Sequence, residues 1–314
     1  MRIRMFASRR ALGWIAAGMS AVITSFWAFW GIIENFHEGW YDYTLTGNIG
    51  LMLIQYLSPM LLFLILAAVA HAFPRIGGIA HIVVGVAVVT LVVNTPAARF
   101  FILTPMVLLG AFYYSSDPIP RRWMILLNIF LPLVVLLVFG ARPAYTVIGR
   151  FDDGFRGERS VEGNGVLLSW APAGPGWAEH GVTWIEARDR CRRLRKDGTG
   201  LSDSILDLWR LPTVDEAVRS LTRNGRNAGG IWNPQLRKAT YALTPDKETP
   251  LWNPHSMIVY WWTSTETDSV HAYRIAYNGQ IHPMMKRMAM GSMGFRAVRS
   301  SSRPPVEAQV KSIR

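Results

Sequence analysis

The sequence has very little cysteine: Cys191 is the only one among 314 residues. A single thiol excludes an intramolecular disulfide and any metal site built on several thiolates. The usual catalytic motifs are also absent, since there is no GxSxG nucleophile turn, no HExxH metal motif and no glycine-rich phosphate loop. We therefore expect no enzymatic activity and no cofactor.

Charge is scarce in the first 140 residues, which hold eight of the 33 Lys and Arg and four of the 21 Asp and Glu. The rest of the chain holds the other 25 basic and 17 acidic residues, so it carries eight of the twelve net positive charges. This partition predicts a membrane part followed by a soluble domain of ordinary size. The expected order is a membrane domain at 1–140, a linker at 141–160, a soluble domain at 161–300 and a flexible tail at 301–314.

Long apolar runs predict an α-helical bundle of about five transmembrane helices. The first run, 11–33, has no charge and exceeds the ~20 residues that a helix needs to cross the hydrocarbon core. It is also longer than the apolar core of a cleaved signal, so we expect an uncleaved signal anchor. The fourth run is the shortest and either crosses or re-enters the membrane. The predicted spans are 11–33, 50–72, 76–93, 100–114 and 123–140.

The arginines of the short loops predict the orientation, because basic residues resist translocation. With five spans, one side of the membrane receives seven arginines and the other receives only Arg99. The N-terminus is then cytoplasmic, and the soluble domain lies outside the cytoplasmic (inner) membrane of a bacterium. A re-entrant fourth run would reverse this result. The seven arginines are Arg2, Arg4, Arg9, Arg10, Arg75, Arg121 and Arg122.

Few polar residues interrupt the predicted spans. His71 and His81 flank Arg75, which favours interfacial histidines over a proton path. The loop 34–42, ENFHEGWYD, is typical of an aromatic belt around Trp40, although its acidic residues and histidine could also hold a cation or dock the soluble domain. Helix contacts and kinks are expected at Gln55, Pro59, Asn128 and Pro132.

Two helices of the soluble half begin with the same signal. Thr183 with Glu186, and Thr213 with Glu216, have the spacing at which a hydroxyl and a carboxylate satisfy the free amides of a first turn. The second helix is expected to stop at the Asn-Gly pair 224–225, which suits a left-handed cap.

Further along, the hydrophobic period changes to two. Strands are expected at 260–265 and 295–299, and a hairpin at 272–277 and 280–284 around the Asn-Gly pair 278–279. Two helices followed by antiparallel strands and long irregular connections predict an α+β domain.

Five motifs of this half follow one another in a characteristic order: TWIEARDRC at 183–191, WRLPTVDE at 209–216, YWWTSTE at 260–266, AYRIAYNG at 272–279 and GFRAVR at 294–299. The set resembles the C-terminal domain of the Lcl-type collagen-like adhesins, over about 165–300. The resemblance implies a C-type-lectin-like fold, related more distantly to the formylglycine-generating domain and to variable receptors of diversity-generating retroelements. It does not extend to the membrane part.

The resemblance also bears on chemistry. The family often has a second cysteine in its final strand, at a position that corresponds to Ala297 here, so Cys191 is expected to be a buried lone thiol. The formylglycine-generating branch holds copper with paired cysteines, which this chain cannot supply. A lectin-like scaffold instead implies binding.

Two segments are candidate ligand surfaces. The WNP copies at 232–234 and 252–254 are typical of loop turns, but aromatic rings nearby could also receive a sugar or a peptide. The segment 281–294 contains His282 and five methionines, which favour packing or a partner surface over a Cu(I) site. No metal site is expected. The candidate ligand-binding residues are Trp252, Asn253, Trp261, Tyr273, Lys286 and Arg287.

The sequence therefore predicts a multi-pass membrane protein that displays a non-catalytic binding or adhesion domain outside the cell membrane. Its basic excess favours an anionic polysaccharide or an acidic protein as the ligand. Nucleic acid is not expected as a partner, because the predicted compartment excludes it. The alternative function is a sensor or assembly module that regulates its own helix bundle or a membrane partner.

Overall fold

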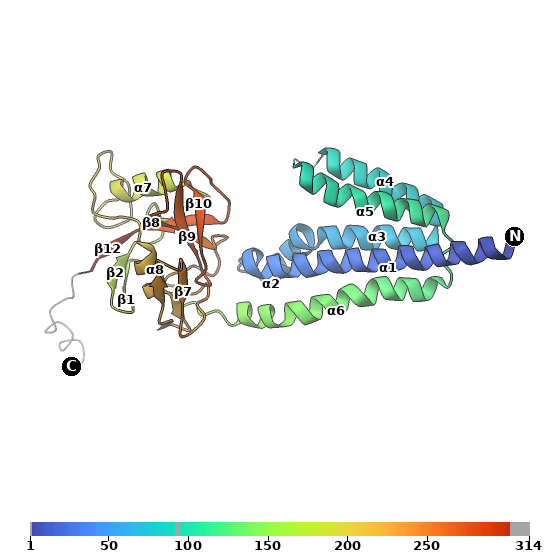
Figure 1. The fold of residues 1–314 in the computed structure, drawn as a ribbon. Helices are drawn as coiled ribbons and strands as arrows, with labels where there is room; N and C mark the ends of the chain where they lie inside the picture. Colours follow the sequence, from blue (N-terminus) through green and yellow to red (C-terminus); the bar gives the residue numbers. More distant parts are fainter. Residues whose placement is uncertain (1, 92–94, 302–314) are drawn as a thin grey trace. The chain divides into compact units, whose positions relative to one another are not determined.

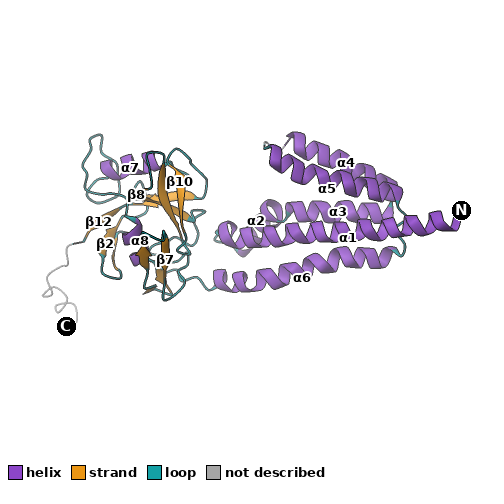
Figure 2. Cartoon of the chain, viewed as in Figure 1, coloured by secondary structure: helices purple, strands orange, loops and turns teal. Residues whose placement is uncertain are grey.

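The computed structural model of the chain describes residues 2–91 and 95–301 (Figure 1). The chain divides into two compact units, one of Met1–Trp40 with Thr44–Val147 and one of Tyr41–Tyr43 with Ile148–Arg314. The first unit is helical, and the second mixes helices and strands (Figure 2). Apart from Ser301, the tail predicted at 301–314 lies outside the described residues.

In the described residues, the first unit is built from six α-helices and two π-helical turns. The runs 11–33, 100–114 and 123–140 each lie within one helix, the run 50–72 is divided by a break at Leu57, and the described part of the run 76–93 is helical, so the prediction of apolar N-terminal helices is confirmed. The α-helices are α1 (Arg2–Glu34), α2 (Leu45–Leu51), α3 (Ser58–Ala72), α4 (Pro74–Leu91), α5 (Pro96–Ser115) and α6 (Arg121–Ile148), and the π-helical turns are η1 (Asn35–Gly39) and η2 (Met52–Tyr56).

Fewer of these helices meet the requirements of a membrane span than the five predicted. By length and composition three qualify, Ser8–Gly39, Pro74–Leu91 and Arg121–Ile148. The pair Leu45–Tyr56 and Ser58–Ala72 qualifies as a fourth if it is one span bent by 65°. The break falls just before Pro59, whose ring removes a backbone donor in the first turn of α3. The helix Arg99–Ser115 is apolar but short.

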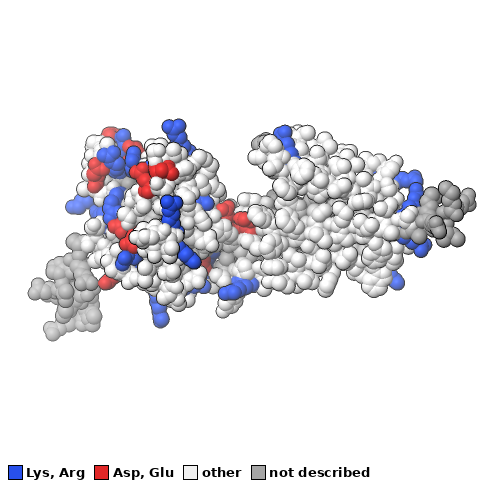
Figure 3. Space-filling model, viewed as in Figure 1, with Lys and Arg blue, Asp and Glu red and all other residues white. Residues whose placement is uncertain are grey.

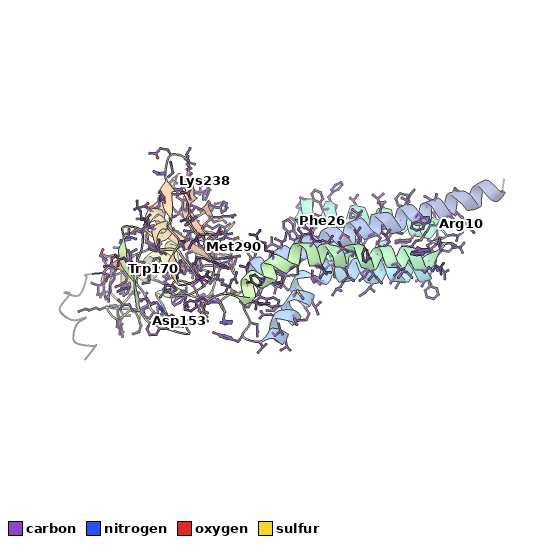
Figure 4. All side chains as sticks on the ribbon, turned by 90° about the horizontal axis from the view of Figure 1, so that it is seen from below. Arg10, Phe26, Asp153, Trp170, Lys238 and Met290 are labelled. Atoms are coloured by element: carbon purple, nitrogen blue, oxygen red, sulfur yellow. The ribbon has the colours of Figure 1, made fainter. Side chains whose placement is uncertain are left out.

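Small residues let the helices of this unit approach closely. A Cβ added to Gly78 of α4 would lie 2.6 Å from the carbonyl oxygen of Gly110 on α5, and one added to Gly77 would lie 2.2 Å from the Ala70 Cα on α3. Such glycines are typical of helix contacts within membranes. The sides of the bundle carry almost no charge, and large apolar side chains such as Phe26 point outward, as a lipid-facing surface requires (Figures 3 and 4).

Up to Ser301, where the described residues end, the second unit contains two helices, a five-stranded sheet, a three-stranded sheet and two short hairpins. The larger sheet has the order β10-β9-β8-β11-β3, and the smaller one has the order β1-β2-β12. The helices are α7 (Trp184–Arg193) and α8 (Val214–Ser220). The strands are β1 (Arg159–Glu162), β2 (Leu167–Trp170), β3 (Trp177–Ala178), β4 (Thr222–Arg223), β5 (Arg226–Asn227), β6 (Ile231–Asn233), β7 (Lys238–Thr240), β8 (Tyr260–Glu266), β9 (His271–Ala276), β10 (Ile281–Met285), β11 (Met293–Arg296) and β12 (Val298–Ser300).

The predicted local signals of this unit are mostly confirmed. Both capping boxes form, with Thr183 and Thr213 accepting from the backbone amides of Glu186 and Glu216. The pair 278–279 turns between β9 and β10, with Gly279 at a φ of 84°. A mixed α+β domain is therefore present.

Three boundaries differ from the prediction. Helix α8 already ends at Ser220, and Asn224 and Gly225, both at positive φ, form the turn between β4 and β5 instead of a helix cap. The predicted last strand is interrupted at Ala297, whose amide donates to Gly176, so its two halves join different sheets. The expected linker begins as helix, because α6 continues to Ile148.

The core of the second unit consists of two apolar clusters. One contains Trp170, Trp252 and Trp261, and the other contains Cys191 and Ala297. Cys191 is free and fully buried, which confirms the lone buried thiol, and burial raises its pKa well above the ordinary range. The thiol is therefore unreactive at neutral pH.

Candidate functional site

A tight turn after α7 presents two cations to solvent. Backbone hydrogen bonds close the turn. The Arg195 amide donates to the Gly200 carbonyl at 2.9 Å, and the amide of Gly198, a residue with a φ of 73°, donates to the Arg195 carbonyl at 2.9 Å. The Thr199 hydroxyl donates to the Asp197 carboxylate at 2.7 Å, and this bond first, with the Thr199 amide next, lowers the pKa of Asp197. The turn is thus rigid, and Asp197 is ionised at neutral pH.

Arg299 of β12 ties this turn to the beginning of β1. Its guanidinium donates to both carboxylate oxygens of Glu158, at 2.7 and 2.9 Å, and to the carbonyl of Lys196 at 2.9 Å. The same guanidinium lies 4.4 Å from the ring centre of Trp209, whose indole NH donates to the Arg195 carbonyl at 2.9 Å. Three segments that are distant in the sequence are thereby held together.

These segments enclose an open depression of about 500 Å³, which we call the Arg195 depression; it is lined by Glu158, Arg195, Lys196, Asp197 and Arg299. Arg299 and Glu158 neutralise each other. Arg195 and Lys196 are exposed and form no ion pair within the described part of the chain. With the ionised Asp197 beside Arg195 and Lys196, the lining of the depression has a net charge of +1 on a fixed backbone, which favours an anionic ligand.

The predicted aromatic surface lies elsewhere and is buried. Trp252 and Trp261 are each 1% exposed, and their rings stack on each other with centres 3.7 Å apart. Tyr273 is 7% exposed and belongs to the same cluster. These rings pack in the core and expose almost no surface, so they cannot contact a ligand in the way that the sequence predicted. Trp252, on the irregular connection before β8, is buried because it stacks on Trp261 of that strand.

Asn253 is also held within the structure. Its side-chain oxygen accepts from Arg156 at 3.0 Å, and its amide donates to Glu179 at 2.7 Å. Both WNP copies are followed by turns, which agrees with the simpler interpretation of those motifs.

Lys286 and Arg287 adjoin each other but differ in environment. Lys286 is buried and donates to the Glu266 carboxylate and to the carbonyls of Asp268 and Ser269, while Arg287 is exposed. The methionines of this segment also differ in exposure: Met293 is fully buried in the core, whereas Met285 is 45% exposed. Of the predicted ligand residues, only Arg287 is fully available to solvent.

The described residues include no group of the usual metal ligands. Within residues 2–91 and 95–301, no group of three or more His, Cys, Asp or Glu side chains is placed to hold a metal ion. The segment 34–42, for which a cation site was an alternative, continues the helix as η1, and the Trp40 ring packs 5.2 Å from that of Phe36.

One segment of the sequence indicates part of the Arg195 depression, although the sequence analysis did not predict that site. The segment 192–198, RRLRKDG, joins a basic run to an Asp-Gly turn pair directly after the capped helix. Its partners Glu158 and Arg299 lie far away in the sequence, so composition alone did not connect them.

Comparisons with known proteins leave the family open. No family model matches the chain, and no curated protein matches it.

Proposed function

We propose that this chain is a membrane-anchored binding protein whose soluble domain takes up an anionic ligand at the Arg195 depression. The observation that carries the proposal is the pair Arg195 and Lys196, which is exposed and unpaired, whereas most neighbouring charges are neutralised. The domain is of the C-type-lectin-like type that its ordered motifs resemble, and its ligand is an anionic polysaccharide or an acidic protein.

The proposed location is outside the cytoplasmic membrane, with the N-terminus inside. Support comes from the distribution of loop arginines. The apolar part of α5, Arg99–Ser115, extends about 25 Å at 1.5 Å per residue, and the proposal counts it as the short fourth of five crossings. Five crossings then place the domain outside. Alkaline phosphatase fused after Arg314 tests this: activity of the reporter is expected, and an inactive but stable fusion contradicts the orientation.

The binding proposal is tested on the full chain in lipid nanodiscs. Polygalacturonate, a carboxylated polysaccharide, and neutral dextran are compared at low and high salt. We expect saturable binding of polygalacturonate that weakens as salt screens the charges, with no binding of dextran. Equal binding of both polymers, or binding that salt does not affect, contradicts the proposal.

A second candidate function is a sensor, in which a change in the soluble domain is transmitted to the membrane part through the segment that joins them. The observation that favours it is that residues directly after the end of α6 at Ile148 are already bound to the soluble domain. The Arg150 guanidinium pairs with Asp246 at 3.1 Å, both side chains being about 5% exposed or less, and the amide of Phe151 donates to Glu248. Only Gly149 lies between α6 and this fixed segment.

The sensor function predicts a membrane partner. Purification of the full chain from native membranes should recover a second membrane protein, which deletion of 149–314 should lose. Insertion of Gly-Ser-Gly-Ser after Gly149 should weaken that association while polygalacturonate binding persists. Recovery of the same proteins in all three preparations contradicts this function.

A further inference from the structure

The helical unit contains a charged pocket that the proposed function does not use. It has a volume of about 360 Å³, which is within the usual range of ligand pockets, and we call it the Arg75 pocket. Arg9 of α1 and Arg75 of α4 line it together with Asp117, which lies in the connection after α5. Three of its other lining residues are large and apolar or aromatic: Phe73, Ile76 and Tyr114.

The charged groups of the pocket are accessible and carry a positive excess. Arg75 is exposed and forms no ion pair among the described residues. A guanidinium nitrogen of Arg9 lies 3.9 Å from a carboxylate oxygen of Asp117, which is too far for a hydrogen bond, and these two side chains are 47% and 41% exposed. Two arginines and one aspartate give the lining a formal charge of +1, which favours an anion.

Further arginines lie close to the pocket. Arg10 is next to Arg9, and Arg121 and Arg122 follow shortly after Asp117 at the beginning of α6. Figure 3 shows basic side chains gathered at the end of the helical unit where the chain begins. Their charges add to the attraction for an anion at this end.

The histidines near Arg75 take no part in the pocket. The sequence predicted that His71 and His81 are interfacial, but they are 1% and 0% exposed and lie inside the unit. Neither of them lines the Arg75 pocket. The positive charges that an anion meets there are therefore those of Arg9 and Arg75.

Backbone contacts fix both walls of the pocket. The amide of Asp117 donates to the carbonyl of Arg9 at 3.2 Å, which joins the connection after α5 to α1. A Cβ added to Gly78 would lie 2.7 Å from the amide nitrogen of Tyr114, so the beginning of α4, which carries Arg75, is held against the end of α5. The backbones of both arginines are thus in place before a ligand arrives, which lowers the entropic cost of binding.

An apolar stripe runs from the pocket along α4. Ile76 lines the pocket, and Ile79, Val83 and Val86 follow it at the spacing of three and four residues that places side chains on one face of a helix. All four are exposed, at 62%, 53%, 60% and 47%. The stripe extends about 15 Å at 1.5 Å per residue. A ligand of the pocket therefore meets a charged end and an apolar surface that continues from it.

We infer that the Arg75 pocket binds the phosphate of an anionic phospholipid, with an acyl chain of that lipid along the apolar stripe of α4. Guanidinium groups present planar sets of donors that match phosphate oxygens. The single negative charge of a phosphodiester balances the formal charge of +1 on the lining. The stripe favours a lipid over a free phosphate ester, because only the lipid has a hydrocarbon chain to cover it.

The test compares dioleoylphosphatidylglycerol with dioleoylphosphatidylcholine, which share their acyl chains and their phosphodiester but differ in net charge. Binding of each lipid to the full chain in detergent is titrated by native mass spectrometry. We expect phosphatidylglycerol to bind about tenfold more tightly, because the arginines repel the choline cation and attract the net negative charge. Equal affinities overturn the inference.

A soluble competitor distinguishes a lipid from a free phosphate ester. Glycerol 3-phosphate carries the phosphate without acyl chains, so at a concentration equal to that of phosphatidylglycerol it should leave the lipid bound. Displacement of the lipid at that concentration would show that the pocket takes the ester alone, and it overturns the assignment to a lipid.

Three variants locate the site. Arg75→Gln removes a cation without breaking an ion pair, so the helical circular dichroism should be unchanged while the preference for phosphatidylglycerol falls to about threefold or less. Arg9→Gln combined with Arg75→Gln should abolish the preference. The matched control Arg142→Gln removes the same charge at an exposed position of α6, about 30 Å along that helix from Arg121, and should leave the preference unchanged.

An unchanged preference in Arg75→Gln overturns the assignment, because binding would then not depend on the pocket. An equal loss in Arg75→Gln and Arg142→Gln overturns it too, since binding would then follow the total charge of the chain. None of these measurements uses polygalacturonate or depends on the orientation in the membrane, so failure here leaves the proposed function of the soluble domain untouched.

Discussion

The two units differ in what they do with buried polar groups. In the soluble unit, several buried side chains are charged and most of them are ion-paired or hydrogen-bonded, as when Asp246 receives both Arg150 and Arg223. In the helical unit, the buried polar side chains are serines, threonines, asparagines and histidines, and several of them, including His71 and Asn128, have a buried atom with no partner among the described residues. Arg195 and Lys196 are exposed cations outside these pairs, and they differ from other exposed cations such as Arg237 and Lys238 because they line the Arg195 depression. In the helical unit, the exposed cations Arg9 and Arg75 line the Arg75 pocket in the same way.

The largest expected effect comes from breaking a buried pair in the soluble unit. Asp246→Asn should lower the free energy of unfolding of that unit by about 3–5 kcal/mol, because Arg150 is left buried without its counter-charge. Urea unfolding followed by tryptophan fluorescence measures it. The control Asp207→Asn removes an exposed partner of Arg192 and should cost under about 1 kcal/mol. Equal losses of unfolding free energy in Asp246→Asn and Asp207→Asn would contradict the expectation that the buried pair contributes more to stability than the exposed pair.

The next largest effect is expected in the helical unit, where the helices are held by close packing of small residues and not by buried ion pairs. Gly78→Val places a Cβ 2.6 Å from the Gly110 carbonyl oxygen and should destabilise the unit by about 1–3 kcal/mol. Gly18 has nothing within 4 Å of an added Cβ, so Gly18→Val is the matched control. Thermal unfolding of the helices in detergent, followed by circular dichroism, checks both. A greater loss in the control would reverse our account of the packing.

A smaller effect is expected at the helix caps of the soluble unit. Thr183→Ala removes the acceptor for the Glu186 amide and should cost about 1 kcal/mol. Thr213→Ala should cost about the same amount, because its cap has the same geometry. Thr240→Ala, at an exposed position of β7, serves as the control in urea unfolding. A cost at Thr240 equal to that at the caps would contradict the capping argument.

The smallest effect concerns a partly exposed pair. The Arg156 guanidinium, which donates to Asp152, lowers the pKa of that carboxyl. Its contribution to stability is therefore complete above the unfolded pKa of about 3.9 and is lost as pH falls through the lower folded value. Asp152→Asn should remove this acid dependence at a cost below about 1 kcal/mol at pH 7. Stability curves of wild type and variant that stay parallel down to pH 2 would contradict the assignment.

The sequence predicted those features that depend on neighbouring residues. The caps at Thr183 and Thr213, the turn at 278–279 and the apolar helices are all local signals, and the structure contains each of them. The second Asn-Gly pair, 224–225, shows the limit, because the same two residues suit a helix cap and a hairpin turn. The end of α8 at Ser220, four residues earlier, decided between them.

The candidate sites depend on tertiary contacts, which is why the sequence missed them. Strand β8 is buried on both faces, with Trp261 and Trp262 at 1% and 0% exposure, so alternation did not reveal an outer face for ligand. The Arg195 depression joins residues that are more than 100 positions apart, and the Arg75 pocket joins α1 to the beginning of α4 and the end of α5. Neither arrangement has a pattern in the linear sequence.

If Arg195 and Lys196 recruit the anionic ligand, a second exposed Arg-Lys pair in the same domain provides the control. Arg237 and Lys238 form a second exposed Arg-Lys pair on the β6–β7 hairpin, where Lys238 projects from the domain (Figure 4). Arg195→Gln with Lys196→Gln, and Arg237→Gln with Lys238→Gln, remove the same charge. Polygalacturonate affinity of the full chain at low salt should fall about tenfold for the first double variant and less than about twofold for the second. Equal losses in the two variants would contradict the account, because binding would then follow net charge and not the Arg195 depression.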